Sequence, residues 1–297
     1  MIDIKTGGSA PTGINSRDDL IYKPNQKEDF SISRSKVENF IKCSRCFYLN
    51  LVRGLMEPDC PKMTLNTLTD TLLKKEFDSC RKKNTSHRIL KKYKLNHIVP
   101  YKNDNFAKDE YGKVVKKYKG KKNEQSVKLL DAWRDFRYGV RRRFKNTNII
   151  LYGAVDDIWF NSKNNELIVA DYKSTQKEES IKQETYFDDQ YKKGYKFQLD
   201  FYAYLLKGQK EINGIDNDIS NDAYFLVVNA RGLEKSFDGK MIFEEKLIHH
   251  TIDDSYLEDT IENMIVTINS TKIPPSERMC KNCAYARQRS KTDRTGQ

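Results

Sequence analysis

The sequence predicts an α/β fold in which a helical lobe precedes a central sheet, and three observations lead to this class. Apolar residues recur with helical spacing over residues 36–51 and 65–81, which predicts two helices before any strand. Residues 153–173 then form two β-prone runs around the polar turn 161–165, which is a hairpin signal. Residues 223–228 are a continuous apolar run, as is typical of a buried central strand.

The remaining stretches place further elements around this core. Residues 82–125 are basic, weakly periodic and loop-rich. We expect a mostly disordered lead-in over residues 1–29 and one folded domain over 30–286, whose segment 61–150 is a basic helical lobe inserted before the sheet. The other expected elements are a helix over 126–138, a helix over about 190–207, a strand over 241–251, a helix from 253 to about 268 and a flexible tail over 287–297.

Charge is distributed unevenly along the 297 residues, whose net charge is +12. Lys and Arg minus Asp and Glu give +1 for residues 1–60, +16 for 61–150 and −5 for 151–297. A basic excess confined to one segment favours a nucleic acid as partner, although a solvated Lys-rich surface has the same composition. No apolar run approaches the ~20 residues needed to cross a bilayer, so no membrane partner is expected. Residues 1–10 lack the basic and apolar regions of a signal peptide, which predicts a cytoplasmic protein.

The predicted hairpin carries two carboxylates and a lysine that its strands bring together. Asp171 and Lys173 are two residues apart in a strand and therefore share a face, and Asp156 of the other run comes against them across the hairpin. Two carboxylates suit Mg²⁺ or Mn²⁺, and a neighbouring lysine orients the attacking water and offsets charge on a phosphate. This arrangement is typical of a metal-dependent phosphodiester nuclease. An ion pair along an exposed strand, worth at most about 1 kcal/mol, is the alternative interpretation.

The sequence Gly153-Ala-Val-Asp156 followed by Asp171-Tyr-Lys173 resembles the PD-(D/E)XK nuclease superfamily, especially its RecB-like and Cas4-like branch. That branch carries Gln-x-x-x-Tyr on the last helix of its core, and the chain has Gln198 and Tyr202 at this spacing. The resemblance covers roughly residues 31–286. It implies a restriction-endonuclease-like core, with a mixed central sheet flanked by helices.

The resemblance also implies a role for each matching residue. The metal ligands would be Asp156, Asp171 and the carbonyl of Tyr172. Lys173 would position the nucleophilic water. Gln198 and Tyr202 would steady the active site and approach the DNA backbone, whereas the alternative for this pair is an ordinary helix face with a core tyrosine.

The function implied by the resemblance is that of a Mg²⁺- or Mn²⁺-dependent DNA nuclease. Its substrate would be single-stranded DNA or a DNA end, which an exonuclease degrades in DNA repair, recombination or CRISPR adaptation. DNA would approach over the basic segment 61–150. Two alternatives stay open, namely a non-catalytic nucleic-acid-binding module of the same fold and an RNA-directed nuclease.

One departure from the family concerns the helix before the sheet. Related nucleases often carry a metal-binding histidine there, whereas residues 65–81 contain none. Asp70 or Glu76 would substitute as an oxygen ligand, or either is an ordinary solvated helix residue. Asp157 adjoins Asp156, but strand alternation lets only one of them face the site, and the family spacing selects Asp156.

Four of the six cysteines form two Cys-x-x-Cys pairs near opposite ends of the chain. The pairs are Cys43 with Cys46, expected at i, i+3 on the first helix, and Cys280 with Cys283 in the C-terminal segment. Four thiolates suit Zn²⁺ or an iron–sulfur cluster. Cas4-like relatives hold a 4Fe–4S cluster, which favours a cluster here, but they use one N-terminal and three C-terminal cysteines. Zinc and unligated cysteines therefore stay open, and Cys60 and Cys80 are expected as free thiols.

Overall fold

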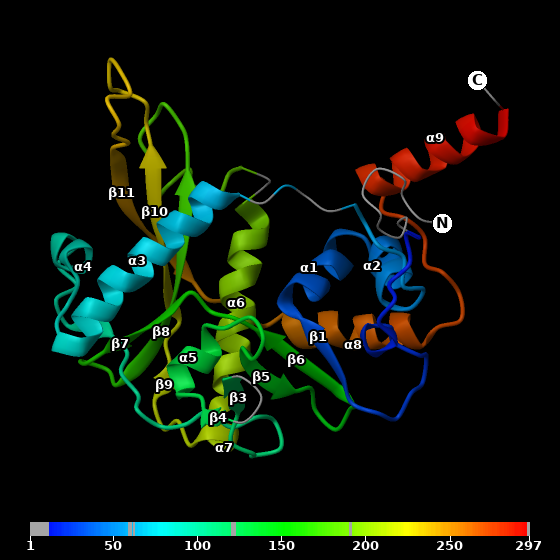
Figure 1. Cartoon of the computed structure of the whole chain (residues 1–297), viewed down its shortest axis with the longest axis horizontal. Coiled ribbons are helices and arrows are strands. Elements are labelled where there is room, and N and C mark those ends of the chain that lie inside the picture. Colours follow the sequence, from blue (N-terminus) through cyan, green and yellow to red (C-terminus); the bar gives the residue numbers. More distant parts are fainter. Residues whose placement is uncertain (1–11, 59–60, 62, 120–122, 190–191, 296–297) are drawn as a thin grey trace. The chain divides into compact units, whose positions relative to one another are not determined.

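The computed structural model shown in Figure 1 describes residues 12–58, 61, 63–119, 123–189 and 192–295. The predicted free thiol Cys60 lies outside the described residues, as does the start of the lead-in. The chain divides into two compact units, one formed by residues 1–61 with 256–297 and the other by residues 62–255.

Helices dominate the first unit, and strands dominate the second. The unit of residues 1–61 and 256–297 contains η1 (Asp18–Leu20), β1 (Phe30–Ser33), α1 (Arg34–Lys42), α2 (Ser44–Leu51), α8 (Leu257–Asn269) and α9 (Lys281–Thr295). The helices of the unit 62–255 are α3 (Thr64–Lys83), α4 (Arg88–Lys92), α5 (Leu129–Trp133), α6 (Lys193–Lys207) and α7 (Gln209–Asn213). Its strands are β2 (Ile98–Pro100), β3 (Lys116–Lys119), β4 (Asn123–Ser126), β5 (Val140–Arg143), β6 (Ile149–Gly153), β7 (Asp157–Asn161), β8 (Glu166–Thr175), β9 (Asp218–Ile219), β10 (Asp222–Ala230) and β11 (Phe243–Thr251).

A mixed sheet forms the centre of the unit 62–255, in the strand order β11-β10-β8-β7-β2, with β9 beside β8. Strand β8 is parallel to β10, while β7 pairs with β8 and β11 pairs with β10 in the antiparallel sense. β8 and β10 are buried over most of their length, as expected of strands in a sheet whose two faces are both covered. The predicted α/β fold with a mixed central sheet flanked by helices is confirmed.

Successive residues of β8 point to opposite faces, and different helices cover those faces. On one face Ala170 and Tyr172 belong to a buried cluster with Phe77 of α3 and Leu90 of α4. On the other face, Asp171 reaches α6 through a hydrogen bond. The sheet therefore separates an aromatic core beneath α3 from a polar site beneath α6.

The predicted hairpin is present as β7 and β8, with Asp157 opposite Ala170 and Asn161 opposite Glu166. Its first strand is shorter than the sequence suggests, because β6 ends at Gly153 and β7 begins only at Asp157. Asp156 therefore lies in the link between these two strands.

Two predicted helices differ from the structure. The first, expected over 36–51, is broken at Cys43, whose extended backbone ends α1 and begins α2. The helix expected over 126–138 is limited to α5, and Phe136, which lies beyond its end, is 80% exposed. The chain turns at Gly139 with a φ of +66°, where a Cβ atom would lie 2.8 Å from the Gly153 carbonyl oxygen. Only glycine permits this approach, which lets β5 pair with β6.

Helix α3 matches the helix predicted over 65–81, but its buried face is narrower than expected. Leu73 and Phe77 are buried, whereas Leu68 and Leu72, which belong to the apolar pattern that predicted the helix, are each 54% exposed. The N-terminal half of α3 thus extends beyond the sheet that its C-terminal half covers.

The helical unit is held together by α8, which packs against α1 and α2. The Tyr48 hydroxyl donates a hydrogen bond to the Ser270 carbonyl at 2.9 Å, and the Tyr22 hydroxyl donates to Asn269 Oδ1 at 2.9 Å. Tyr22 of the lead-in is thus buried, and the predicted tail 287–297 is helical as far as Thr295. Within the described part of the chain, no helix has the length and apolar character needed to span a membrane.

Candidate active site and cysteine site

Gln198 of α6 joins the predicted carboxylate to the predicted lysine. Its Nε2 donates to Asp171 Oδ1 at 2.6 Å, and its Oε1 accepts from Lys173 Nζ at 3.1 Å. The same Nε2 lies 3.4 Å from the hydroxyl oxygen of Tyr202, one turn further along α6. Tyr202 is buried. The structure therefore brings together four of the predicted residues from β8 and α6.

Asp156 is held by donors from two different elements. Its Oδ2 accepts from the backbone N–H of Tyr172 at 3.0 Å, and its Oδ1 accepts from Lys74 Nζ of α3 at 3.1 Å. Burial opposes ionisation of Asp156, but Lys74, Lys173 and the Tyr172 N–H outweigh burial and lower the pKa of this carboxyl group. Asp156 is therefore a carboxylate at neutral pH.

Asp171 differs from Asp156 in its protonation. Burial raises the pKa of Asp171 to about 7, with Asp156 adding to the rise and Lys173 opposing it. Lys173 Nζ lies 2.5 Å from Asp171 Oδ2. Burial alone would lower the pKa of Lys173, but Asp171 and Asp156 raise it overall. Lys173 is therefore a cation at neutral pH, next to one carboxylate and one carboxyl group close to its titration point.

Asp157 lies on the other side of the backbone from the site. It is fully buried, its Oδ2 accepts from the Tyr172 hydroxyl at 2.7 Å, and it forms an ion pair with Arg81 of α3. The Tyr172 ring packs against Phe77. Asp156, and not Asp157, is thus the neighbour of Asp171, and only the backbone of Tyr172 belongs to the site.

Lys74 joins the site although no sequence motif marks it. Its Nζ lies 2.9 Å from Asp70 Oδ2 as well as 3.1 Å from Asp156 Oδ1. The only signal in the sequence is the i, i+4 spacing of Asp70 and Lys74, which is common on helix surfaces. Glu76, the other acidic residue considered on this helix, instead pairs with Arg88 and His87.

The donor atoms at the site fit a hard divalent cation, because Mg²⁺ and Mn²⁺ prefer oxygen ligands. Asp171 Oδ2 and Asp70 Oδ1 are buried without a hydrogen-bond partner among the described residues, the ion pair with Lys173 lacking hydrogen-bond geometry. The site therefore fits an ion bound by Asp156 and Asp171. Asp70 is linked to Asp156 through Lys74, which contacts both carboxylates.

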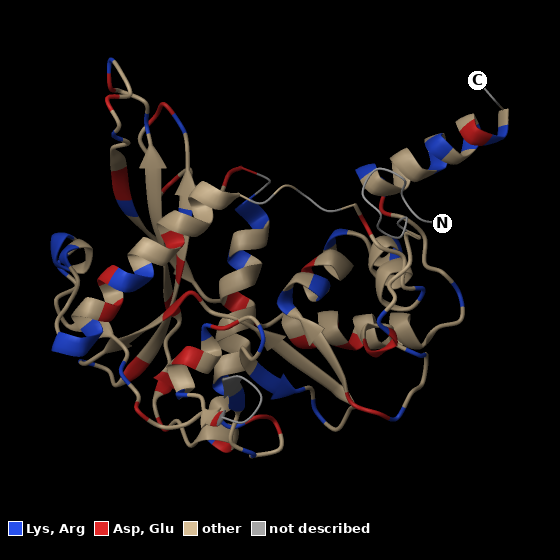
Figure 2. Cartoon of the chain, in the orientation of Figure 1, with Lys and Arg blue, Asp and Glu red and all other residues tan. Residues whose placement is uncertain are grey.

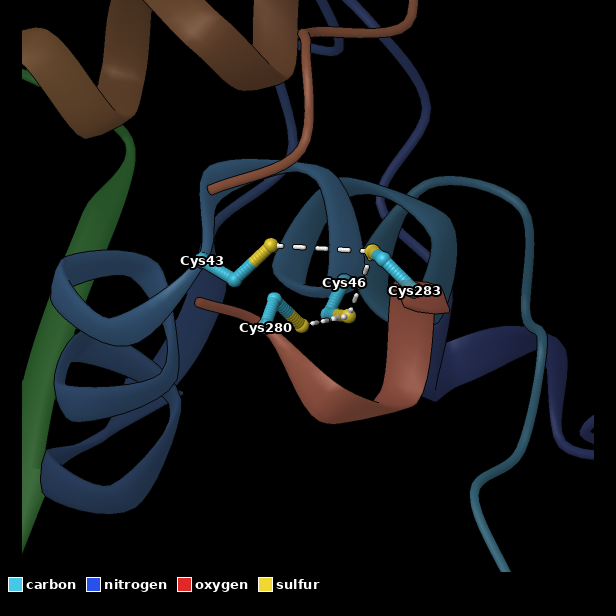
Figure 3. A group of neighbouring side chains, drawn as sticks. All are labelled: Cys43, Cys46, Cys280 and Cys283. Atoms are coloured by element: carbon cyan, nitrogen blue, oxygen red, sulfur yellow. Dashed lines mark hydrogen bonds between the residues drawn. The ribbon is translucent and has the colours of Figure 1, made fainter. Parts of the chain in front are cut away.

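The four paired cysteines gather in the helical unit, as Figure 3 shows. Sγ–Sγ distances are 3.4 Å for Cys46 and Cys283, 3.5 Å for Cys46 and Cys280, and 3.8 Å for Cys43 and Cys283. All four Sγ atoms lie within 4.8 Å of one another. Cys80 lies on α3, in the other unit, and forms no disulfide with another described cysteine. The predicted two-plus-two cysteine group is thus assembled.

Cys43, Cys46 and Cys283 differ in acidity. Burial raises the pKa of Cys43, but the backbone N–H groups of Cys46 and Glu277 outweigh it and lower the value to about 7. Burial is the main cause of the raised pKa of Cys283, about 11, and of the still higher pKa of Cys46. A metal that binds here therefore displaces protons from Cys46 and Cys283.

The chain was compared with protein families and with curated proteins. A model of the PD-(D/E)XK nuclease superfamily matches residues 31–288, a range that contains the β7–β8 hairpin, α6 and all four cysteines of the group. Among the curated proteins nothing matches. The chain therefore belongs to the PD-(D/E)XK nuclease superfamily.

Proposed function

We propose that the chain is a Mg²⁺- or Mn²⁺-dependent DNA nuclease that hydrolyses phosphodiester bonds as an exonuclease on single-stranded DNA or DNA ends. Asp156, Asp171 and the Tyr172 carbonyl hold the ion. The ion, when bound, polarises the phosphate and lowers the pKa of a bound water. The rest of the chemistry rests on Lys173 and Gln198.

The observation that carries the proposal is the double hydrogen bond of Gln198. Because one amide group contacts both Asp171 and Lys173, it fixes the carboxylate and the cation relative to each other. If Asp171 and Lys173 formed only an ordinary ion pair along a strand, neither would need a hydrogen bond from Gln198. Tyr202 holds the amide from the next turn of α6. Positioned groups of this kind contribute to catalysis because their order is already present before the substrate binds.

Lys173 acts as a cation in this proposal. Two neighbouring acidic groups raise its pKa, so it retains its proton at neutral pH. A protonated lysine orients the attacking water by donating to it and offsets negative charge that develops on the phosphate. It does not remove the proton from that water.

Substrate binding is supported by a lysine cluster at the end of α3, on α4 and directly after α4. The α3–α4 lysine cluster consists of Lys82, Lys83, Lys91, Lys92 and Lys94. All five are exposed, and none forms a salt bridge with another described residue. Figure 2 shows basic residues gathered over α4 and the adjoining end of α3. Lys74 lies near the middle of α3, nine residues or roughly 14 Å before Lys83, so a nucleic acid that contacts the cluster could also reach Lys74.

The experiment is degradation of end-labelled single- and double-stranded DNA in Mg²⁺, Mn²⁺ or EDTA. Lys173→Ala is expected to lower the cleavage rate about 10²- to 10³-fold, with DNA affinity little changed. Lys163→Ala, on the exposed turn of the same hairpin, is the matched control and retains activity. Equal cleavage by Lys173→Ala and the original protein would exclude the assigned role of Lys173.

The choice of polymer is tested separately. Because a basic surface binds DNA and RNA alike, binding alone does not distinguish them. Cleavage of matched DNA and RNA oligonucleotides is measured at one stated salt concentration. Preferential RNA cleavage would replace the DNA proposal. Tight binding without cleavage in either metal would indicate a non-catalytic module.

A further inference from the structure

The four-cysteine group differs in geometry from the iron–sulfur site that the resemblance implies. We infer that Cys43, Cys46, Cys280 and Cys283 hold a single tetrahedral metal ion, Zn²⁺ by its chemistry, and not a 4Fe–4S cluster. The inference is independent of the nuclease reaction, since all four residues belong to the helical unit and the carboxylates belong to the other.

The distances between sulfur atoms distinguish the two kinds of centre. Four thiolates around one Zn²⁺, each about 2.3 Å from the ion, occupy the corners of a tetrahedron with edges of about 3.8 Å. The measured Sγ–Sγ distances of 3.4, 3.5 and 3.8 Å agree with these edges. In a 4Fe–4S cluster each cysteine binds a different iron, so the four thiolates surround the whole cluster and stand farther apart. The group is too compact for that arrangement.

The backbone around the two pairs repeats the same local design. Cys43 is the N-cap of α2 and Cys46 its third residue, while Cys280 directly precedes α9 and Cys283 is the third residue of that helix. Helix N-termini stabilise thiolates, because N–H groups and the helix dipole point towards them. Two Cys-x-x-Cys turns, each opening a helix and meeting face to face (Figure 3), supply a complete set of four protein ligands. A closed set of this kind is typical of structural zinc.

The ion would act as a clasp, that is, as a link between the two chain segments 1–61 and 256–297 that form the unit. It joins the α1–α2 junction to the start of α9, residues separated by more than two hundred positions in the chain. Beyond Cys283 every described residue of α9 is exposed, so the helix has no apolar face of its own to attach it. A metal ion at this site also explains why the predicted helix is broken at Cys43, since a continuous helix would not place Cys43 at a helix N-terminus.

The test is metal and sulfide analysis of the full-length protein. The protein is produced in medium supplied with both iron and zinc and is purified without oxygen. We expect about one zinc per chain, no acid-labile sulfide and a colourless solution. Four irons with sulfide and a brown colour would overturn the inference. So would a protein that contains no metal and takes up none when zinc is added.

Cobalt substitution and a matched pair of variants test the ligands. Co²⁺ in place of the native ion should give the intense blue-green absorption of a tetrahedral thiolate site, which a cluster does not produce. Cys46→Ser should weaken zinc retention against a chelator at least tenfold, whereas Cys80→Ser should leave it unchanged. Unchanged retention in Cys46→Ser would contradict the assignment. If Cys46→Ser does not fold, the cobalt spectrum of the unsubstituted protein still decides the coordination.

Discussion

The carboxylate site and the cysteine group differ in what compensates their negative charge. At the carboxylate site the protein supplies its own cations, since Lys74 pairs with Asp156 and Lys173 with Asp171. At the cysteine group, the side-chain hydrogen bonds of the sulfurs in the described part of the chain are to one another. Four thiolates at these distances repel one another unless a metal neutralises them. The first site therefore has its own counter-charges without an ion, whereas the second, without an ion, keeps Cys46 and Cys283 protonated.

This difference predicts a catalytic role for the carboxylate site and a structural role for the cysteine group. An ion that is optional for folding is free to exchange and to leave a coordination position open for substrate, as catalysis requires. An ion that completes a closed set of ligands contributes folding free energy instead. Changes at the carboxylates should therefore affect activity and spare stability, and changes at the cysteines should do the reverse.

The largest expected effect is the loss of stability on removing the cysteine-bound ion. Structural zinc contributes on the order of 10 kcal/mol in small zinc domains, so a strong chelator should unfold the helical unit. Thermal melting and limited proteolysis with and without chelator measure this, because two units need not unfold together. Cleavage of residues 256–297 should accelerate while the unit 62–255 stays resistant. Identical melting and proteolysis under both conditions would refute the proposed clasp.

The next effect in size concerns Asp171→Asn. Asparagine keeps the shape and still accepts from Gln198 Nε2, but it removes a metal-binding charge. Cleavage should fall about 10²- to 10³-fold, while the melting temperature stays within a few degrees, about 1 kcal/mol. Asp216→Asn, an exposed carboxylate of the same unit, is the control for both measurements. A large fall in melting temperature without loss of cleavage would indicate a structural role for Asp171 and contradict its catalytic role.

Local spacing predicted much of this arrangement. The period of two along β8 placed Asp171 and Lys173 on one face, and the i, i+4 spacing placed Gln198 beside Tyr202. Both patterns depend only on the geometry of a strand or helix, which the sequence specifies over a few residues. The hairpin and the central strand were predicted for the same reason.

The residues that sequence reasoning missed depend on contacts between distant segments. Lys74 reaches Asp156 across 82 positions, and Arg81 fixes Asp157 from the same helix. Neither pairing leaves a local pattern, because α3 could present any of its charged residues to the sheet. The break at Cys43 likewise accompanies a contact with a distant residue, since the Cys43 sulfur lies 3.8 Å from that of Cys283. Its own neighbours have helical spacing, which therefore predicted a continuous helix.

A smaller effect is the pH dependence of metal binding at the carboxylates. Since the pKa of Asp171 is raised to about 7, chiefly by burial, Mg²⁺ must displace a proton below that pH. The apparent affinity should rise about tenfold between pH 6 and pH 8 and then level off. Titration calorimetry with Mg²⁺ or Mn²⁺ at pH 6, 7 and 8 measures this. Asp171→Asn should remove the pH dependence together with most of the affinity, and an affinity that is constant over this range would contradict the assignment.

The same carboxyl group affects stability in the metal-free protein. Because its folded pKa lies above its unfolded value of 3.8, the stability it contributes is complete below that value and is lost as the pH rises through about 7. Bound metal should offset this loss. The stabilisation by Mg²⁺, measured as a shift in melting temperature, should therefore be larger at pH 8 than at pH 6.

The smallest expected effect concerns the α3–α4 lysine cluster, which neither site needs for its fold. The double variant Lys91→Gln with Lys92→Gln should weaken DNA binding a few-fold. It should also make the slope of log affinity against log salt concentration shallower by up to about 1.4, because each lost phosphate contact on a single strand contributes about 0.7. Lys210→Gln with Lys240→Gln removes the same charge from exposed positions outside the cluster and is the control. Equal slopes for the two double variants would show that net charge, and not this surface, attracts the nucleic acid. A slope that falls only in the first variant would place the path of the substrate along α3, towards the site where Lys74 and Asp156 meet.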